Sequence, residues 1–275
     1  RAAGHGKTGG MCYNGKNRKD KGPNRMKKHT DPNARLGGEL MSAKVVERLA
    51  AELKTGRYAG QDRLPAEVEL AAQLGVSRTV VRDALSELER EGFVERVRGI
   101  GTVVNRDVVA LENRADHKLE FYSMIRARGC EPRSDHLDVT REAADAPLAE
   151  SLGIRAGDTV LRIHRRVFAD DVPVIYSSDA IPLALFDQNK LAKMDLSRPV
   201  FDLLEEAAGQ QTASTVAHIR AVTGDAQVRR LLSCGESQAL LMLDETFYSR
   251  LCRPILHCNT YYTDFFDFSI VRKLM

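Results

Sequence analysis

Two arginines four residues apart are the first residues of this chain whose types and spacing point to a chemistry. They begin a helical pattern whose polar face comprises Ser77, Arg78, Thr79 and Arg82, and whose other face is apolar. An arginine guanidinium can hold O6 and N7 of guanine bidentately in the major groove of DNA. The N-terminal residues of a recognition helix reach base edges, and its backbone N–H groups bind phosphate. We interpret this stretch as a DNA-reading helix; the alternative is a surface helix with solvated arginines.

A second basic group follows directly after this helix. Residues 93–97 and 101–104 have the composition of two short strands, and Arg98-Gly99-Ile100 joins them. Arg96, Arg98 and Gly99 are therefore expected near the tip of a hairpin, where they would contact the DNA backbone or the minor groove. Glycine at the tip permits close approach. A basic hairpin after a recognition helix is typical of a winged helix-turn-helix and argues against the solvated-surface alternative.

Two charged residues in the second half of the chain interrupt apolar strand faces. Arg165 falls among Leu161, Ile163 and Val167, and Glu245 among Leu241, Leu243 and Phe247, always at alternate positions. Since alternate residues of a strand share a face, both charges are predicted to be buried. A buried charge needs a partner or a ligand. The functional interpretation is an effector pocket in which Arg165 grips an anion and Glu245 a hydroxyl or an amine. The alternatives are that the two pair with each other or lie at a dimer interface.

The DNA-reading pattern needs a scaffold, and the residues around it predict one. Residues 42–55 place apolar side chains on one helical face, with Ser42 as an N-cap and Gly56 as a stop. Residues 66–74 and 77–91 predict two further helices. We expect a winged helix-turn-helix over 41–106, a linker over 107–118 and a different domain over 119–275. Residues 1–40 are basic and lack apolar periodicity, which predicts a flexible tail; Met26 and Met41 are both plausible start sites.

The domain over 119–275 contains an internal repeat. Residues 148–165 and 228–245 match at an offset of 80, and the match continues, after one inserted residue, from 171–174 to 252–255. Each copy has the pattern helix, strand, polar turn, strand. Two such units predict an antiparallel sheet with helices on one face, so the fold class expected for the whole chain is α+β.

Residues 43–104 resemble the DNA-binding domain of the GntR family of bacterial transcription regulators. The residues that carry the resemblance are Leu64-Pro65-Ala66-Glu67, Leu70-Ala71, the run from Val76 to Leu85, Leu88, Gly92 and Gly99-Ile100-Gly101-Thr102. The resemblance implies that DNA contacts fall on Ser77, Arg78, Thr79, Arg82, Arg98 and Gly99. The chain departs from the family at Val68, where many members carry arginine, and this implies the loss of one phosphate or base contact.

Residues 119–270 resemble the UTRA effector domain of the HutC-like branch of that family, which has a chorismate-lyase-like fold. The residues that carry this looser resemblance include Phe121, Gly129, Leu152-Gly153, Val160-Leu161, Arg165, Pro173-Val174, Ile181-Pro182, Pro254-Ile255 and Tyr262. Together with the strand faces, the resemblance yields five effector-binding candidates: Glu120, Arg165, Ser177, Glu245 and Tyr262. The Pro-punctuated strand pairs argue against the all-helical sensor of another branch.

The effector domain departs from its family where the family holds phosphate. Only the first of an arginine pair is present, at Arg165, and the second position is Val167. Glu120 stands where many members have Ser or Thr, and Ser177 where many have an acidic residue. Losing a cation and gaining an anion disfavours a sugar phosphate, so we expect a carboxylate, an amine-bearing metabolite or a mainly apolar molecule. Further polar residues on the strands, interpreted mostly as sheet-surface or interface residues, are Tyr176, Asp179, His257, Asn259 and Tyr261.

Composition leaves few other classes of protein. The 275 residues are 43% hydrophobic, enough for two cores, and the net charge is only +3, with basic residues concentrated towards the N-terminus. Five scattered cysteines without a CxxC pair argue against disulfides or a zinc site and favour the cytoplasm. The sequence contains no run that could span a membrane and no motif for a cofactor.

These observations favour a ligand-responsive transcription regulator that acts as a homodimer. We expect a repressor that a small-molecule effector releases from a palindromic operator. An architectural DNA-binding protein without an effector is the first alternative. An enzyme is the second, because the effector domain resembles a lyase in fold, but Glu120, Arg165, Glu245 and His257 form no recognisable nucleophile–base constellation.

Overall fold

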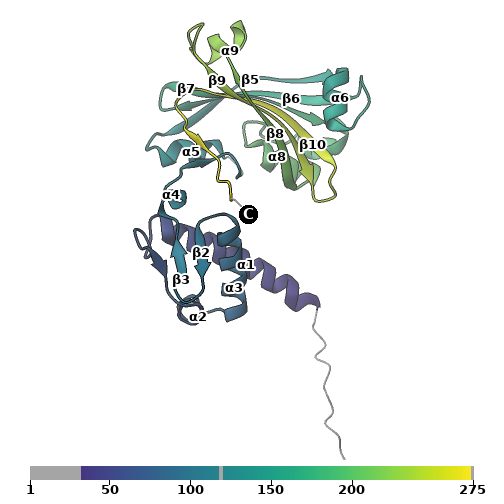
Figure 1. Ribbon diagram of the computed structural model, residues 1–275. Coiled ribbons are helices and arrows are strands. Elements are labelled where there is room, and N and C mark those ends of the chain that lie inside the picture. Colours follow the sequence, from purple (N-terminus) through teal and green to yellow (C-terminus); the bar gives the residue numbers. More distant parts are fainter. Residues whose placement is uncertain (1–31, 118–119, 274–275) are drawn as a thin grey trace, which may run out of the picture.

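The DNA-reading helix lies in a small amino-terminal domain, here called the head (residues 32–105), at the bottom of Figure 1. It belongs to a computed structural model that describes residues 32–117 and 120–273. The head combines three helices with a three-stranded sheet of order β1-β3-β2. Its elements are α1 Pro32–Lys54, β1 Arg63–Leu64, α2 Glu67–Leu74, α3 Arg78–Arg90, β2 Val94–Val97 and β3 Gly101–Val104. The predicted winged helix-turn-helix is confirmed.

One apolar core joins the three helices of the head. Leu49 from α1, Leu70 from α2 and Leu85 from α3 are fully buried, and each such burial stabilises the head by about 1.5–3 kcal/mol. Gly75 ends α2 in the left-handed conformation, with φ 68°, which turns the chain so that α3 can cross α2. The apolar face of α3 is buried as predicted, so its polar face points outward.

Helix α1 begins at Pro32, so the prediction of an N-cap at Ser42 and of a flexible tail reaching residue 40 is wrong. Proline suits the first helical position because its missing N–H is not needed there and its φ is preset. Once nucleated, a helix gains one hydrogen bond per added residue, and this carries α1 through Gly37 and Gly38. The rest of the predicted tail, residues 1–31, lies outside the described residues.

The carboxy-terminal domain, here called the sensor (residues 120–264), is built on one six-stranded antiparallel sheet (Figure 1). The strand order is β5-β6-β7-β10-β9-β8. The strands are β5 Pro132–Ala143, β6 Thr159–Ala169, β7 Val172–Pro182, β8 Thr212–Val222, β9 Leu240–Ser249 and β10 Pro254–Tyr262. The predicted repeat units are α6 Ala146–Leu152 with β6 and β7, and α9 Ala226–Leu231 with β9 and β10. Their hairpins meet where β7 pairs with β10, which confirms the α+β fold class.

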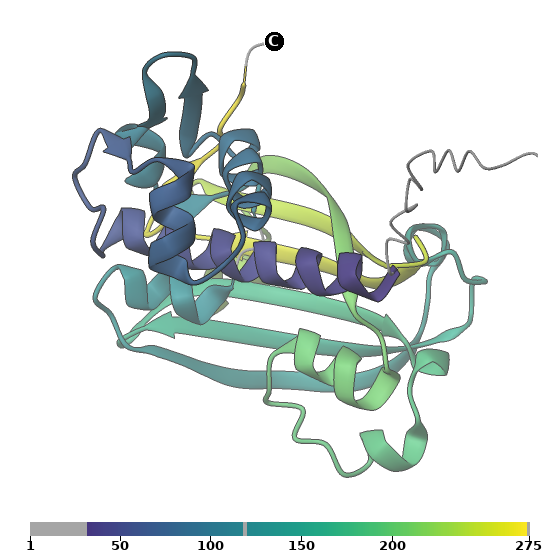
Figure 2. The same cartoon turned by 90° about the horizontal axis from the view of Figure 1, so that it is seen from below.

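Helices cover both faces of this sheet, whereas the repeat predicted helices on one face. α6 and α9 pack on the face that carries Val160 and Tyr176. The other face is covered by α5 Phe121–Ala127, α7 Gln188–Leu191, α8 Val200–Ala208 and the 3-10 turn Leu183–Leu185. The prediction was wrong because α5, α7 and α8 lie outside the two repeated copies. In the view of Figure 2, α1 of the head runs in roughly the same direction as the long strands of the sheet.

Two segments connect the sensor to the head. The predicted linker contains a short helix, α4 Arg106–Val109, and a strand, β4 Asn113–Arg114. After β10 the chain turns back towards the head, and β11 Phe268–Ser269 pairs in parallel with β4 (Figure 1). Residues 265–273, here called the C-terminal strap, therefore leave the sensor in which the prediction had placed them. Within the described part of the chain, no helix is long and apolar enough to cross a membrane.

Candidate DNA interface and effector pocket

The polar face of α3 is exposed to solvent at the start of the helix. Ser77 caps the helix, since its hydroxyl accepts a hydrogen bond from the backbone N–H of Val80 at 3.3 Å. Arg78, Thr79 and Arg82 are all exposed. This is the end from which a recognition helix reaches base edges. The structure thus brings together the four residues that were predicted on this helix.

Arg82 also contacts α2. Its Nη2 lies 3.2 Å from Oε2 of Glu67, and the two side chains are 58% and 27% exposed. An ion pair as exposed as this contributes at most about 1 kcal/mol, so DNA can displace the glutamate from the arginine. The contact orients the guanidinium of Arg82 but is weak enough for the arginine to bind DNA instead.

The hairpin after α3 presents two of its three predicted contacts at the tip. Arg98 and Gly99 are exposed, and Gly99 has φ 80°, a value that favours glycine. Arg96 lies away from the tip: its guanidinium donates two hydrogen bonds to Oε2 of Glu89 on α3, at 2.8 and 2.6 Å. Arg96 therefore fastens the wing to the recognition helix, and a DNA contact from it stays a prediction.

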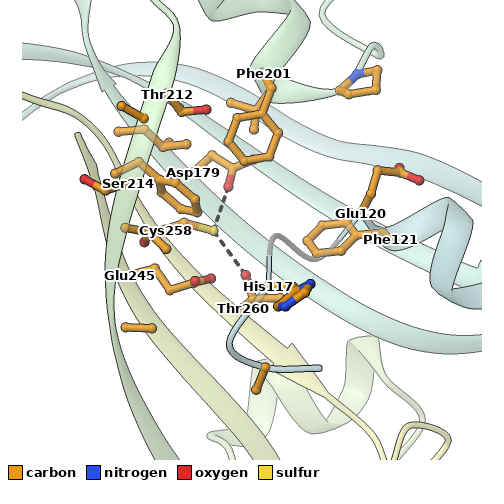
Figure 3. A pocket seen from close by; sticks show the side chains of 18 of the residues that line it. His117, Glu120, Phe121, Asp179, Phe201, Thr212, Ser214, Glu245, Cys258 and Thr260 are labelled. Carbon is orange, nitrogen blue, oxygen red and sulfur yellow. Dashed lines mark hydrogen bonds between the residues drawn. The ribbon is translucent and has the colours of Figure 1, made fainter. Parts of the chain in front are cut away.

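The sensor contains a cavity of about 460 Å³ on the sheet face that carries α5 and α8 (Figure 3). Its walls come from strands β6 to β10, from the start of α8, and from residues 115–117 and 120–121. Four of the five predicted effector residues line it: Glu120, Arg165, Glu245 and Tyr262. The fifth, Ser177, is fully buried behind the lining, and its hydroxyl has no hydrogen-bond partner among the described residues.

Arg165 lines the cavity with unused capacity to donate hydrogen bonds. It is 5% exposed, and its Nη2 donates to the carbonyl of Arg198 at 2.7 Å. Its Nε is buried without a partner in the described part of the chain. A buried unpaired donor costs about 1–3 kcal/mol, and an anion in the cavity would remove that cost.

The strand register places two carboxyl groups and a thiol in one row across the cavity. Asp179 on β7 pairs with Cys258 on β10, and Cys258 pairs with Glu245 on β9. Residues directly opposite each other on antiparallel strands share a face. The Cys258 thiol donates to Oδ1 of Asp179 at 2.8 Å and lies 3.1 Å from Oγ1 of Thr260 (Figure 3).

Asp179 belongs to the group of strand residues interpreted mostly as sheet-surface or interface residues, and for Asp179 that interpretation is wrong, because the side chain is 2% exposed and lines the cavity. Cys258, Thr260 and His117 also line the cavity without having been predicted. A signal for Asp179 existed in the sequence: it alternates with Ile175, Ser177 and Ile181. Its pairing with Cys258 could not be predicted, because the two residues belong to different copies of the repeat.

Glu245 is half-buried rather than buried as predicted, and partial or full burial raises the pKa of both carboxyl groups. The pKa of Glu245 rises to about 7, first because of burial and then because of the charges of Asp179 and Asp244. Burial also raises the pKa of Asp179, against the opposing effects of Arg165 and of the hydrogen bond from Cys258. The pKa of the Cys258 thiol is raised well above its usual value, again by burial first, so the thiol keeps its proton and donates it. The protonation of the two carboxyls thus depends on what enters the cavity.

An aromatic cluster joins the cavity to the C-terminal strap. The ring of Tyr262, which lines the cavity, packs edge-on against Phe121, Phe266 and Phe268 at centroid distances of 6.1, 5.7 and 4.9 Å. Phe268 belongs to β11, which pairs with β4. Tyr262 contacts the strap directly, and Phe121 contacts it through Tyr262, so a ligand that touches either ring is connected to the strap by packed side chains.

The strap ends against the last turn of the recognition helix. Val271 packs on the core of the head. The Nζ of Lys273 donates to the backbone carbonyl of Glu89 at 2.9 Å. Beside it, Arg114 of β4 donates to the carbonyl of Glu91 at 2.8 Å. The strap and β4 together hold the C-terminal end of α3.

The described residues offer little for metal or disulfide chemistry. None of their His, Cys, Asp and Glu side chains gather in groups of three or more that could hold a metal ion. The four described cysteines, Cys130, Cys234, Cys252 and Cys258, are all free thiols.

A winged helix-turn-helix head joined to a separate domain with a buried polar cavity defines a transcription regulator with a ligand sensor. Residues 41–104 match the family model of bacterial regulatory proteins of the gntR family, and residues 127–264 match the UTRA domain. The chain belongs to the GntR family, among the members that carry a UTRA sensor.

Relatives of known class agree with this assignment. The HTH-type transcriptional repressor NagR of Bacillus subtilis (strain 168) is 25% identical over 218 residues, which cover 79% of this chain and 88% of NagR. The HTH-type transcriptional regulator GgaR of Escherichia coli (strain K12) is 30% identical over 179 residues, 58% of this chain and 70% of GgaR. The crystal structure of the possible transcriptional regulator YydK of Bacillus subtilis has the same fold, with a TM-score of 0.66 at 14% identity, covering 86% of this chain and 99% of YydK. The chain is a ligand-responsive, DNA-binding transcription regulator.

Proposed function

We propose that the chain is a cytoplasmic, homodimeric repressor that leaves a palindromic operator when a small molecule occupies the sensor cavity. The observation that carries this proposal is the C-terminal strap, because it runs from the cavity wall at Tyr262 to the last turn of α3 at Glu89. A ligand changes operator affinity only if it binds two arrangements of the heads unequally. Because the strap contacts both the cavity wall and α3, it offers a physical route by which a ligand in the cavity can change the position of α3.

On the operator, α3 enters the major groove. Arg78 and Arg82 read base edges, while Ser77 and Thr79 bind phosphate. The exposure of these side chains on one surface supports this division of roles. The wing follows the DNA backbone or the minor groove with Arg98 and Gly99, and Arg96 acts through the wing that it fastens to α3.

Inside the cavity, Arg165 is the anion-binding group, and Glu245 holds a hydroxyl or an amine. Ser177, the register partner of Arg165 on β7, supports it from behind the lining. Glu120 caps α5 with its carboxylate, so its part in binding is to hold Phe121 at the rim. Tyr262 contacts both the cavity and the strap, so a ligand that moves Tyr262 also moves the strap. We assign no catalytic reaction to this cavity.

The second copy of the chain binds at the outer edge of the sheet. β8 ends the strand order, and the side chains of residues 213–221 are exposed, with Val216 52% and Ile219 47% exposed. A long exposed edge strand offers unpaired backbone groups to another strand. Antiparallel pairing of two β8 strands creates the two-fold axis that a palindromic operator requires. Because β8 also forms one wall of the cavity, the effector and the dimer edge share one strand.

The operator is found by selecting tight-binding duplexes from a random pool, and its release is then followed by fluorescence polarisation with a metabolite library. Salt is held fixed because phosphate contacts make DNA affinity strongly salt-dependent. We expect a palindromic consensus and at least one compound that releases it. Binding without sequence preference and without response to any compound would indicate an architectural protein. Turnover of a bound metabolite by the purified chain would indicate an enzyme.

The dimer edge is tested by light scattering on the full chain. We expect wild type to be a dimer and Ile219→Lys, which places a charge on the exposed edge, to be a monomer. Val172→Lys is the matched control, because Val172 is 61% exposed but lies at the start of β7, in the β6–β7 hairpin, and not on β8. If Ile219→Lys stays dimeric, the subunits meet through another surface.

A further inference from the structure

Among the described residues, more carboxyl groups than basic side chains line the sensor cavity. Its acidic lining residues are Asp116, Glu120, Asp179 and Glu245. The described part of the lining also includes one arginine, Arg165, one histidine, His117, and no lysine. The two carboxylates at the rim already have partners, since Asp116 accepts from Arg114 at 2.6 Å and Glu120 caps α5. The unbalanced charge therefore lies deeper, at the row that crosses β7, β10 and β9.

Asp179 and Glu245 form no ion pair with any described residue, although the nearby charge of Arg165 lowers the pKa of Asp179. The Nη2 of Arg165 donates to the carbonyl of Arg198 instead of to either carboxyl. Asp179 accepts one hydrogen bond, from the thiol of Cys258, and none reaches Glu245 from any described residue. Since removing a charge from water without a partner is costly, these two groups either keep a proton or wait for a ligand that brings positive charge.

We propose that the effector carries a protonated amine, which lies over Cys258 between the carboxylates of Asp179 and Glu245. This inference rests on the proposed function, in which the cavity is the effector site. Asp179 and Glu245 flank Cys258 on the two neighbouring strands, so their Cα atoms lie about 10 Å apart. At that separation the two side chains can approach one nitrogen from opposite sides (Figure 3). An ammonium group supplies three donors and one positive charge to them.

The other end of the same molecule is acidic. Arg165 lies one row further along the sheet face, paired with Ser177, and its buried Nε has no partner among the described residues. A carboxylate two or three bonds from the amine satisfies that donor. A zwitterion of the amino-acid type therefore matches both ends of the cavity. A sugar phosphate satisfies Arg165 but brings a dianion beside two carboxyl groups.

The pH dependence of binding separates an amine from an anionic ligand. The groups that face Glu245 are Asp179 from β7 and Cys258 and Tyr262 from β10, with Asp244 adjacent on its own strand, and Arg165 and His117 line the same cavity. Burial first, and then the charges of Asp179 and Asp244, raise the pKa of Glu245 to about 7. An amine needs the carboxylate, so its affinity increases from pH 6 to pH 8. An anionic ligand prefers the protonated acid, so its affinity decreases over the same interval.

Ethylammonium chloride is the probe, because it carries the amine and makes almost no demand on cavity shape. Thermal unfolding of the full chain is measured in ethylammonium chloride, sodium acetate and sodium chloride at equal ionic strength. At pH 8 we expect ethylammonium to raise the Tm of wild type by about 2 °C over sodium chloride, and by less at pH 6. Glu245→Gln should lose this difference. Glu236→Gln, the same change at an exposed position outside the cavity, should retain it.

Three results would overturn the amine site: equal Tm values in ethylammonium and sodium chloride, a larger rise in acetate, or an undiminished rise in Glu245→Gln. If Glu245→Gln does not fold, the pH comparison on wild type still decides. The melting assay uses no DNA, so it separates the two ideas. An amine effect without operator release would overturn the proposed function alone, and operator release only by compounds without an amine would overturn the amine site alone.

Discussion

The head and the sensor use charged side chains in opposite ways. In the head, Arg82 is 58% exposed and shares only a weak ion pair with Glu67. In the sensor, Arg165 is 5% exposed and lies near two carboxyl groups that form no ion pair with any described residue. DNA phosphates bind at the protein surface. Arginines that remain hydrated before DNA binds therefore add no desolvation penalty to folding. A small ligand must instead complete a set of charges that folding has already removed from water.

This difference separates recognition from regulation within one chain. The head is complete before it meets DNA, whereas the sensor is electrostatically incomplete until it is filled. The C-terminal strap joins the two, since it is packed against Tyr262 at one end and bound to the end of α3 at the other. The expected results below test this contrast in order of decreasing effect.

Arg82→Ala should have the largest effect on the head. We expect operator affinity to fall by about 10- to 100-fold, because a bidentate arginine–guanine contact contributes about 1–3 kcal/mol. The melting temperature should hardly change, since Arg82 is exposed. Fluorescence polarisation at fixed salt measures the loss. Glu67→Gln is the control: it removes the ion-pair partner but leaves the arginine, so affinity should hold or increase. Wild-type affinity in Arg82→Ala would mean that another face of α3 reads DNA.

Arg165→Met should have the reverse profile. Operator affinity should stay within about twofold, while the concentration of effector needed for release should increase about tenfold or more, because hydrogen bonds to charged groups contribute about 1.5–3 kcal/mol. The measurement is a titration of effector against a preformed operator complex. Arg141→Met, on the exposed edge strand β5, is the matched control and should respond as wild type. An unchanged response in Arg165→Met would place the anion site elsewhere.

Phe268→Ala tests the strap that connects the two regions. The ratio of operator affinities without and with effector should shrink by about two- to thirtyfold, the range of about 0.5–2 kcal/mol that single residues contribute to coupling. The affinity for effector in the absence of DNA should change much less. Leu251→Ala removes a similar apolar side chain at a position that is 78% exposed, and should leave the ratio intact. A wild-type ratio in Phe268→Ala would show that the cavity and the head communicate by another route.

The smallest expected effect is the dependence of stability on pH. The pKa of Glu245 is raised from its ordinary 4.5 to about 7, so between these values the folded chain keeps a proton that the unfolded chain has lost. Stability should therefore decrease as pH rises from about 4.5 to about 7 and change little above. After allowance for partial exposure, the loss due to Glu245 is about 1–2 kcal/mol. Urea unfolding of wild type and Glu245→Gln should converge at low pH and separate above pH 7; parallel curves would contradict this.

Local periodicity was enough to predict much of the head. The faces of α3 and the pair β2–β3 both follow from residues close together in the sequence, and both are confirmed. The start of α1 was wrong because glycine and proline near a helix N-terminus resemble a coil. In the sensor, alternation alone predicted that Arg165 is buried, and the repeat predicted both hairpins.

The sequence by itself determined which domains form and that Arg165, among the charged side chains of the strands, leaves water, because both depend on patterns of a few residues. Only the tertiary structure decided which of those side chains meet. Asp179 reaches Cys258 because β7 happens to pair with β10, and the strap reaches Glu89 because the chain returns across the linker to the head. Such contacts join residues far apart in the chain, where pairing of strands and packing of a core, rather than local preference, set the neighbours.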